Sequence, residues 1–167
     1  MICQTPRLTL REFHHDDAPF IVTLLNDKSF IENIVDKNVR TNDDAIKYLN
    51  DGPMASYEKH GYGLYMVTLN DCDTPIGMCG LVKRDDFDYA DIGYSLLPQY
   101  YGQGYAIEAA KAIVDFCQNT LGFDTLAAIT KPANSRSNSL LDKLGFEFQE
   151  VIEYYDQPTN FYLLALN

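Results

Sequence analysis

The hydrophobic and polar positions of the chain predict its elements in order. Residues 7–13 alternate with period two, which is typical of a strand with one buried face. Apolar residues then recur at helical spacing over 18–26 and around 30–35. A third helix is expected after Thr41, where Thr41 to Asp44 loosely matches a capping box. It is expected to break at Asp51-Gly-Pro53 and to resume as a short piece up to residue 60.

The pattern then changes to strands over 63–69, 75–82 and 89–97, whose short connections indicate an antiparallel meander. A long amphipathic helix follows Gly104 and stops at Gly122. An apolar strand over 123–129, a short helix around 140–144 and a closing pair of strands over 146–152 and 160–166 complete the chain. We therefore expect an α+β fold. It has a mixed, mainly antiparallel sheet of about six or seven strands, helices on both faces, and one parallel crossover after the Gly-x-Gly helix.

Composition narrows the class of protein. The 167 residues predict a single domain over 1–167, and 46% hydrophobic with 22% charged residues is ordinary for a soluble protein. The net charge of -11 argues against nucleic-acid binding and an anionic membrane surface, and weakly favours a cationic partner such as an amine. Four scattered cysteines, with no signal-peptide pattern and no long apolar run, predict a reduced protein of the cytoplasm.

A glycine pair, Gly102 and Gly104, separates a predicted strand from the long helix. The first N–H groups of a helix have no intrahelical partner, and glycines allow the backbone to approach a ligand closely. This arrangement favours a phosphate-bearing ligand held by the backbone amides of residues 102–107. The dinucleotide fingerprint requires a third glycine, where this chain has Ile107, and no Walker loop is present. A plain strand-to-helix turn is the alternative.

The surroundings of the glycine pair resemble the GNAT superfamily of acetyl-CoA-dependent N-acetyltransferases. Gln99-x-x-Gly-x-Gly104 looks like its motif A, and Asn134-x-x-Ser137 followed by Lys143-Leu-Gly-Phe146 looks like its motif B. Other pieces are similar to the branch that acetylates ribosomal-protein N-termini: Thr5-Pro-Arg-Leu-Thr-Leu-Arg11, Pro75-Ile-Gly77, Asp91-Ile-Gly-Tyr94 and Gly104-Tyr-Ala-Ile-Glu-Ala109.

The resemblance implies acetyl-CoA as cosubstrate and no metal. The pyrophosphate would bind N–H groups of the loop before the helix, and the pantetheine arm would lie beside the preceding strand like an added strand. The residues implied in cosubstrate binding are Ser95, Leu96, Leu97, Gln99, Gly102, Gln103, Gly104, Tyr105, Ala106, Asn134 and Ser137. For Asn134 the alternative is a simple helix cap.

Acyl transfer requires deprotonation of the amine and stabilisation of the thioester oxygen. The family implies a backbone N–H for the oxygen, here that of Leu96 or a neighbour. Asp91 is the first candidate for the base, against the alternative of an exposed strand carboxylate or a cross-strand pair, and Glu12 and Glu108 are lesser candidates. Several family members carry a tyrosine acid at the position of Leu141, so that acid is excluded here. Ser137 is a possible proton donor, and the thiolate could also leave unaided.

The acceptor is predicted less sharply. A peptide or protein N-terminus and a small primary amine both fit, with direct attack in a ternary complex, and a non-catalytic acyl-CoA sensor is the alternative. Three acidic residues of one turn, Asp85, Asp86 and Asp88, could attract a cation or be merely solvated. We expect a monomer or homodimer.

Overall fold

The computed structural model of the chain describes residues 1–166. Its strands form one sheet in the order β1-β2-β3-β4-β5-β6-β8-β7. The strands are β1 (Cys3–Gln4), β2 (Leu8–Arg11), β3 (Leu64–Leu69), β4 (Pro75–Val82), β5 (Asp91–Leu96), β6 (Thr125–Thr130), β7 (Glu147–Tyr154) and β8 (Gln157–Ala165). The α-helices are α1 (Ala18–Leu25), α2 (Lys28–Asn33), α3 (Asn42–Leu49), α4 (Ala55–His60), α5 (Tyr105–Asn119) and α6 (Ser135–Leu144).

The sheet is antiparallel except between β5 and β6, which are parallel neighbours joined through α5. The predicted α+β fold, meander and parallel crossover are therefore confirmed. The prediction of six or seven strands is low, because the sheet has eight. The strand missed is β1, where Cys3 and Gln4 pair with Leu10 and Thr9. Two residues are too few to produce a visible period in the sequence.

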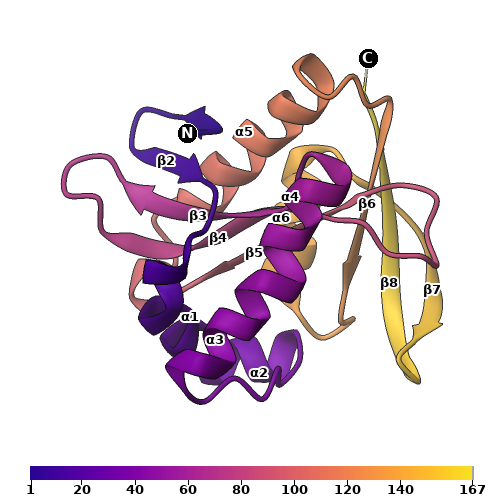
Figure 1. Cartoon of the computed structure of the whole chain (residues 1–167). Helices are drawn as coiled ribbons and strands as arrows, with labels where there is room; N and C mark the ends of the chain where they lie inside the picture. The colour runs from indigo at the N-terminus through magenta and orange to yellow at the C-terminus, as the bar shows by residue number, and fades with distance from the viewer. Residues whose placement is uncertain (167) are drawn as a thin grey trace.

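Helices cover both faces of the sheet, and each face has its own core. On one face α1, α2 and α3 pack against Met66 and Met78 of the central strands. On the other face α5 and α6 pack against Cys79, Leu81 and Ile92. Figure 1 shows α3 and α4 crossing in front of the central strands, with α6 behind them. The alternation of side chains along each strand thus feeds two separate hydrophobic clusters.

The predicted break at Asp51-Gly-Pro53 is wrong. Residues Asn50–Met54 form a π-helical turn, η2, that joins α3 to α4 without interruption. Proline cannot donate the usual helical hydrogen bond, and a wider turn accommodates that loss inside a continuing helix. The buried position of Pro53 places its ring in the protein interior.

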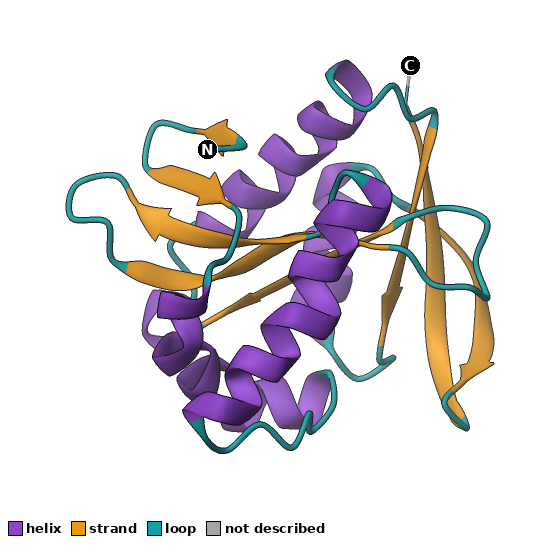
Figure 2. Cartoon of the chain, viewed as in Figure 1, coloured by secondary structure: helices purple, strands orange, loops and turns teal. Residues whose placement is uncertain are grey.

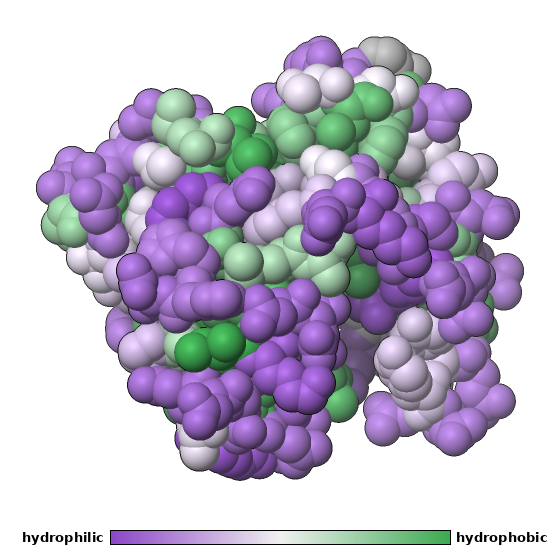
Figure 3. Space-filling model, viewed as in Figure 1, coloured by the Kyte–Doolittle hydropathy of each residue, from purple (hydrophilic) through white to green (hydrophobic). Residues whose placement is uncertain are grey.

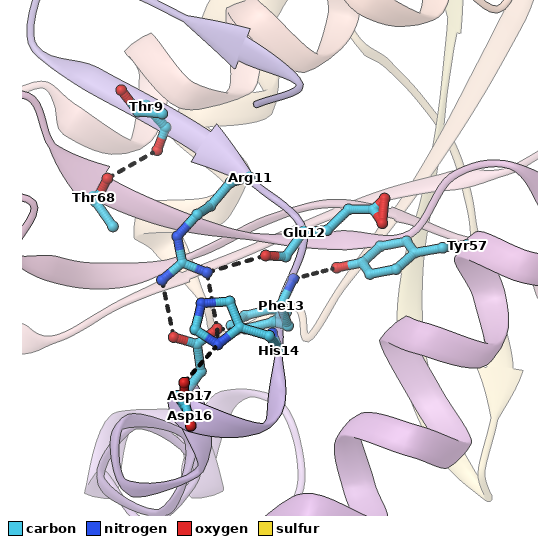
Figure 4. A network of polar contacts seen from close by, with 9 residues as sticks. All are labelled: Thr9, Arg11, Glu12, Phe13, His14, Asp16, Asp17, Tyr57 and Thr68. Carbon is cyan, nitrogen blue, oxygen red and sulfur yellow. Dashed lines mark hydrogen bonds and ion pairs between the residues drawn. The ribbon is translucent and has the colours of Figure 1, made fainter.

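Two polar arrangements fix where the first helices begin. Thr41 and Asp44 form the predicted capping box at the start of α3, with N–H···O distances of 3.1 and 3.2 Å. Arg11 at the end of β2 holds the buried carboxylate of Asp17 through both terminal nitrogens at 2.9 Å (Figure 4). This bidentate pair ties the sheet to the residue that precedes α1.

Candidate active site

The parallel strands β5 and β6 diverge and leave a fork in the middle of the sheet. Their register contains one pair, Asp91 with Ala127, where the Ala127 N–H donates to Ala90 O at 2.9 Å. No further pair joins the two strands within residues 1–166. Figure 2 shows them separating from that point towards their carboxyl ends. The edge of β5 beyond Asp91 therefore faces an opening instead of a neighbouring strand.

The backbone groups that face this opening follow from the alternation of β5. The N–H of Leu97 donates to Ile76 O of β4 at 2.9 Å, so odd-numbered residues of β5 bond towards β4. The N–H and C=O groups of Tyr94 and Leu96 consequently face the fork. An extended molecule lying there would find strand-like hydrogen-bonding partners.

The side chains of β5 divide between the two faces in the same way. Ile92, Tyr94 and Leu96 belong to the cluster built around α5. Leu97 belongs to the cluster built around α1, α2 and α3, and Asp91 and Ser95 share its parity. We call these the α5 side and the α1–α3 side of the fork.

A glycine loop lies at the open end of the fork, between β5 and α5. Gly102 and Gly104 have φ values of 73° and 83°, in the left-handed region that only glycine occupies at little cost. Gly104 is the N-cap of α5, and its carbonyl accepts from the N–H of Glu108 at 3.1 Å. The N–H groups of the first turn lack intrahelical acceptors, and binding of an anion there stays a prediction.

An arginine that the sequence argument missed braces this loop. The guanidinium of Arg7 contacts Glu108 Oε1 at 2.8 Å and Gln103 O at 3.0 Å, and its Cζ lies 4.3 Å from the centre of the Tyr105 ring. Glu108 also accepts from Thr5 Oγ1 at 2.5 Å. Burial raises the pKa of Glu108, but these donors outweigh burial and lower it overall. Glu108 is thus a bracing residue rather than a base.

The start of α6 lies against both the fork and the glycine loop. The side chain of Asn134 caps α6, accepting from the Ser137 N–H at 3.3 Å, while its amide donates to Ser137 Oγ at 3.1 Å. The hydroxyl of Tyr94 donates to Ser137 O at 3.3 Å, and the Arg136 guanidinium stacks 4.0 Å from the Tyr101 ring centre. The structure therefore brings the start of α6, which carries Asn134 and Ser137, next to β5 and the loop.

Two residues near the start of α6, Tyr94 and Leu141, are relevant to proton transfer. Burial raises the pKa of Tyr94 to about 12, so this hydroxyl is a hydrogen-bond donor over the whole neutral range. Leu141 is 1% exposed and belongs to the core. The position of Leu141 is therefore structural in this chain.

Asp91 lies at the origin of the fork and is 2% exposed. Its Oδ2 accepts from Nε of Arg84 at 2.7 Å. Burial raises the pKa of Asp91 to about 6, and the positive charges of Arg84 and Lys83 limit the rise. A carboxyl group that titrates near neutrality, at the junction of two diverging strands, is suited to accept a proton. Its pairing with Arg84 was not foreseen.

Aromatic rings surround Arg84 on the α1–α3 side. Its Cζ lies 5.6 Å from the Tyr154 ring centre, and Phe87 packs 5.3 Å from both Tyr154 and Phe161. Three elements meet here: the turn after β4, the hairpin of β7 and β8, and the segment after α2 that carries Lys37. Figure 3 shows the molecular surface hollowed between the helical layer and this hairpin.

Among residues 1–166, no group of three or more His, Cys, Asp or Glu side chains is placed to hold a metal ion. No helix in the same range is long and apolar enough to cross a membrane.

A sheet forked at two parallel strands, with a glycine loop and a helix N-terminus at the open end, is suited to hold an extended ligand that carries an anionic group. Residues 7–147 match the family model of the acetyltransferase (GNAT) domain. The chain therefore belongs to the GNAT acetyltransferase family.

Several relatives share this sequence pattern. An uncharacterized protein of Bacillus subtilis, YkkB, is 31% identical over 106 residues, which cover 61% of this chain and 62% of that protein. The uncharacterized N-acetyltransferase p20 of Bacillus licheniformis is 27% identical over 92% of this chain and 86% of its own length. The ribosomal protein uS5-alanine N-acetyltransferase of Escherichia coli is 31% identical over 58% of this chain and 51% of its length.

Solved structures share the fold. An acetyltransferase of Agrobacterium tumefaciens superposes with a TM-score of 0.84 at 23% identity, covering 98% of this chain and 93% of that one. The microcin C7 self-immunity acetyltransferase MccE, in complex with acetyl-CoA and AMP, superposes with a TM-score of 0.83 at 16% identity, covering 97% and 94%.

Proposed function

We propose that the protein is an N-acetyltransferase that moves an acetyl group from acetyl-CoA to a primary amine in a ternary complex. The observation that carries the proposal is the fork of β5 and β6 with the glycine loop and the free N-terminus of α5 at its open end. Membership of the GNAT family and the acetyl-CoA bound to MccE support this assignment.

The donor would occupy the α5 side and the opening of the fork. Its pyrophosphate would accept from the N–H groups of Gly102, Gln103, Gly104, Tyr105 and Ala106, beside Gln99. Its pantetheine arm would run along Ser95, Leu96 and Leu97. Its amides would form hydrogen bonds with the backbone of Leu96, because the N–H and C=O groups of that residue face the fork. Asn134 and Ser137 would border the arm from the start of α6.

In the reaction, the neutral amine nitrogen attacks the thioester carbonyl carbon. A C–N bond forms, the C–S bond breaks, and coenzyme A leaves as a thiolate that gains a proton. The N–H of Leu96, or that of Tyr94 two residues earlier, would donate to the carbonyl oxygen as negative charge develops. The proton lost by the amine would pass to Asp91 through a chain of water molecules, and Ser137 would donate towards the thiolate.

The acceptor class remains a primary amine, either a peptide N-terminus or a small molecule. The similarity to the uS5-alanine N-acetyltransferase of Escherichia coli favours a peptide N-terminus. A ternary complex fits the two sides of the fork, because donor and acceptor would approach the same opening from opposite faces.

Thiol release from acetyl-CoA with a panel of amines, followed by mass spectrometry of the products, tests this function. We expect acetylated amine and free thiol in equal amounts. Gly104→Asp places a carboxylate in the phosphate loop and should abolish coenzyme A binding, while Gly61→Asp is the matched control. Gly61 has a φ of 80° and open space around it, so the two variants share the backbone strain.

The outcomes separate the alternatives. Tight coenzyme A binding without turnover on any amine would favour a non-catalytic sensor. Unchanged binding of coenzyme A in Gly104→Asp would remove the glycine loop from the proposal.

A further inference from the structure

The guanidinium of Arg84 is bound to the protein through its Nε edge, and the side chain is partly exposed to solvent. Its Nε donates to the buried carboxylate of Asp91 at 2.7 Å, and its side chain is 26% exposed. A guanidinium has five N–H donors, of which the contact with Asp91 uses one and a hydrogen bond to Tyr154 a further one, so that others remain for a ligand. The carboxylate fixes the side chain before any ligand arrives, which lowers the entropic cost of binding to its terminal nitrogens.

A second cation lies within electrostatic range of Arg84. Lys37 belongs to the segment between α2 and α3, and although the residue as a whole is exposed, partial desolvation of its ammonium group is the main cause that lowers its pKa. The positive charge of Arg84 lowers the pKa of Lys37 further, whereas Tyr155 raises it. Two like charges that converge from separate elements repel each other, and an anion between them would relieve that repulsion.

Among residues 1–166, the acidic residues of the neighbouring turn form no ion pair with Arg84 or Lys37. Asp85, Asp86 and Asp88 are all exposed. Asp91 faces Arg84 and is already paired with it. Tyr154 and Phe87 supply aromatic walls beside the guanidinium, which strengthen its field by excluding water. We call the surface formed by Arg84, Lys37 and these two rings the Arg84 surface.

The position of Arg84 relates this surface to the reaction. Asp91, its anchor, lies at the origin of the fork and on the α1–α3 side, opposite α5. Tyr94, whose N–H faces the fork, is three residues further along β5, or about 10 Å. This separation is about the length of a two- to three-residue peptide.

We propose that the acceptor amine also carries an anionic group, a carboxylate or a phosphate, which Arg84 and Lys37 bind about 10 Å from the reacting nitrogen. The proposal rests on the proposed acetyltransferase function and names the substrate class for its acceptor side. Asp91 acts here as a positioning residue for Arg84, in addition to any role towards the amine.

The test compares acceptors that differ only in the anion. One pair is a dipeptide with a free C-terminal carboxylate and its carboxamide. A second pair is a short peptide with glutamate or glutamine at its third residue. A third pair is phosphoethanolamine and ethanolamine, which distinguishes phosphate from carboxylate. We expect kcat/KM to be about ten- to a hundredfold higher for the anionic member of at least one pair.

Variants then assign the preference to the site. Lys37→Gln should lower the anionic-to-neutral ratio several-fold, and Arg84→Lys should lower it further because the bidentate geometry is lost. Lys47→Gln removes the same charge from an exposed lysine on α3 and is the matched control, which should keep the wild-type ratio. Lys37 is exposed, so its replacement keeps the test valid even if changes at Arg84 impair folding.

Each result decides between the two levels of the proposal. Acetylation of amines without any preference for an anionic group would overturn the inference and leave the acetyltransferase function standing. A preference that survives in Lys37→Gln and Arg84→Lys would overturn the assignment to this surface. Coenzyme A binding without acetylation of any panel member would instead overturn the proposed function itself.

Discussion

Arg7 and Glu108 lie 101 residues apart in the sequence and meet in a salt bridge of 2.8 Å between Nε and Oε1. The pair joins the segment before β2 to the first turn of α5, immediately behind the glycine loop. Through Gln103 O, the same guanidinium also holds the loop backbone. The conformation of the proposed phosphate site therefore depends on a residue near the start of the chain.

Replacing Glu108 with Gln should loosen this brace. We expect the free energy of unfolding to fall by about 1 kcal/mol at pH 7, because partly exposed ionic hydrogen bonds contribute in this range. The KM for acetyl-CoA should rise while kcat changes little. Asp115→Asn, an exposed charge change on the same helix, is the control for chemical denaturation and kinetics.

The pH dependence of this brace has a definite sign. The folded pKa of Glu108 is lowered, so its contribution to stability is present above its ordinary pKa and is lost as pH falls through the folded value. The difference in stability between wild type and Glu108→Gln should therefore shrink at acidic pH. A constant difference from pH 7 to pH 3 would contradict an ionised role for Glu108.

Alanine at either loop glycine should be costly. Gly102→Ala and Gly104→Ala would force a left-handed residue to carry a Cβ, which costs about 1–2 kcal/mol. At Gly104 the Cβ would also lie 3.3 Å from Nη2 of Arg7, whereas at Gly102 it meets nothing within 4 Å. Calorimetric titration of coenzyme A should show the larger loss of affinity for Gly104→Ala. Gly61→Ala, with the same kind of strain far from the loop, should keep full affinity.

The acidic limb of the pH–rate profile should report Asp91. Its pKa of about 6 means that the carboxyl is protonated below that pH and can no longer accept a proton from the amine. We expect kcat/KM to decline below about pH 6 in the wild type, and the decline to disappear in Asp91→Asn together with most of the activity. The exposed Asp88→Asn should retain both. An unchanged acidic limb in Asp91→Asn would remove Asp91 as the base.

The titration of Asp91 makes folding stability depend on pH with the opposite sign to that of Glu108. The folded pKa of Asp91 is above its ordinary value of 3.8, so the unfolded chain releases this proton first as pH rises. The stabilising contribution is complete below 3.8 and is lost between there and about 6. Urea denaturation midpoints of wild type and Asp91→Asn across this range would measure it.

Removing the Tyr94 hydroxyl should affect binding more than proton transfer. Tyr94→Phe loses a hydrogen bond to Ser137 O across the fork. The free energy of coenzyme A binding should become less favourable by about 1 kcal/mol. Because the pKa of Tyr94 is raised to about 12, the shape of the pH–rate profile between pH 6 and 9 should stay as in the wild type. A basic limb that shifts in Tyr94→Phe would instead identify this hydroxyl as the acid.

The sequence predicted the features that local patterns control. Period-two runs located seven strands, helical spacing located the amphipathic helices, and the Gly-x-Gly pair located the loop that caps α5. The capping box at Thr41 and Asp44 was also legible, because all its atoms lie within four residues. The two-residue β1 and the π-turn at Pro53 are too short to produce a periodic pattern in the sequence.

The partners of the site residues were less predictable, since they depend on how distant segments pack. Arg84 reaches Asp91 because the turn after β4 folds back along β5. Lys37 and Arg7 arrive from segments dozens of residues away and carry no motif of their own for a role at this site. The cap at Asn134 shows the converse case, in which a residue predicted to contact the ligand also has a structural role. Its contact with coenzyme A stays a prediction.

The parity of β5 has a consequence for how this protein could be redesigned. In the proposed function, side chains at even positions of β5 would border the donor and those at odd positions the acceptor, so a single inserted or deleted residue in β5 would exchange the two sets and destroy both. Substitutions confined to the side chain of Ser95 and to the segments around Lys37 and Arg84 would leave the backbone register intact. A library varied only at such positions should therefore yield catalysts for new amines that keep the original acyl donor.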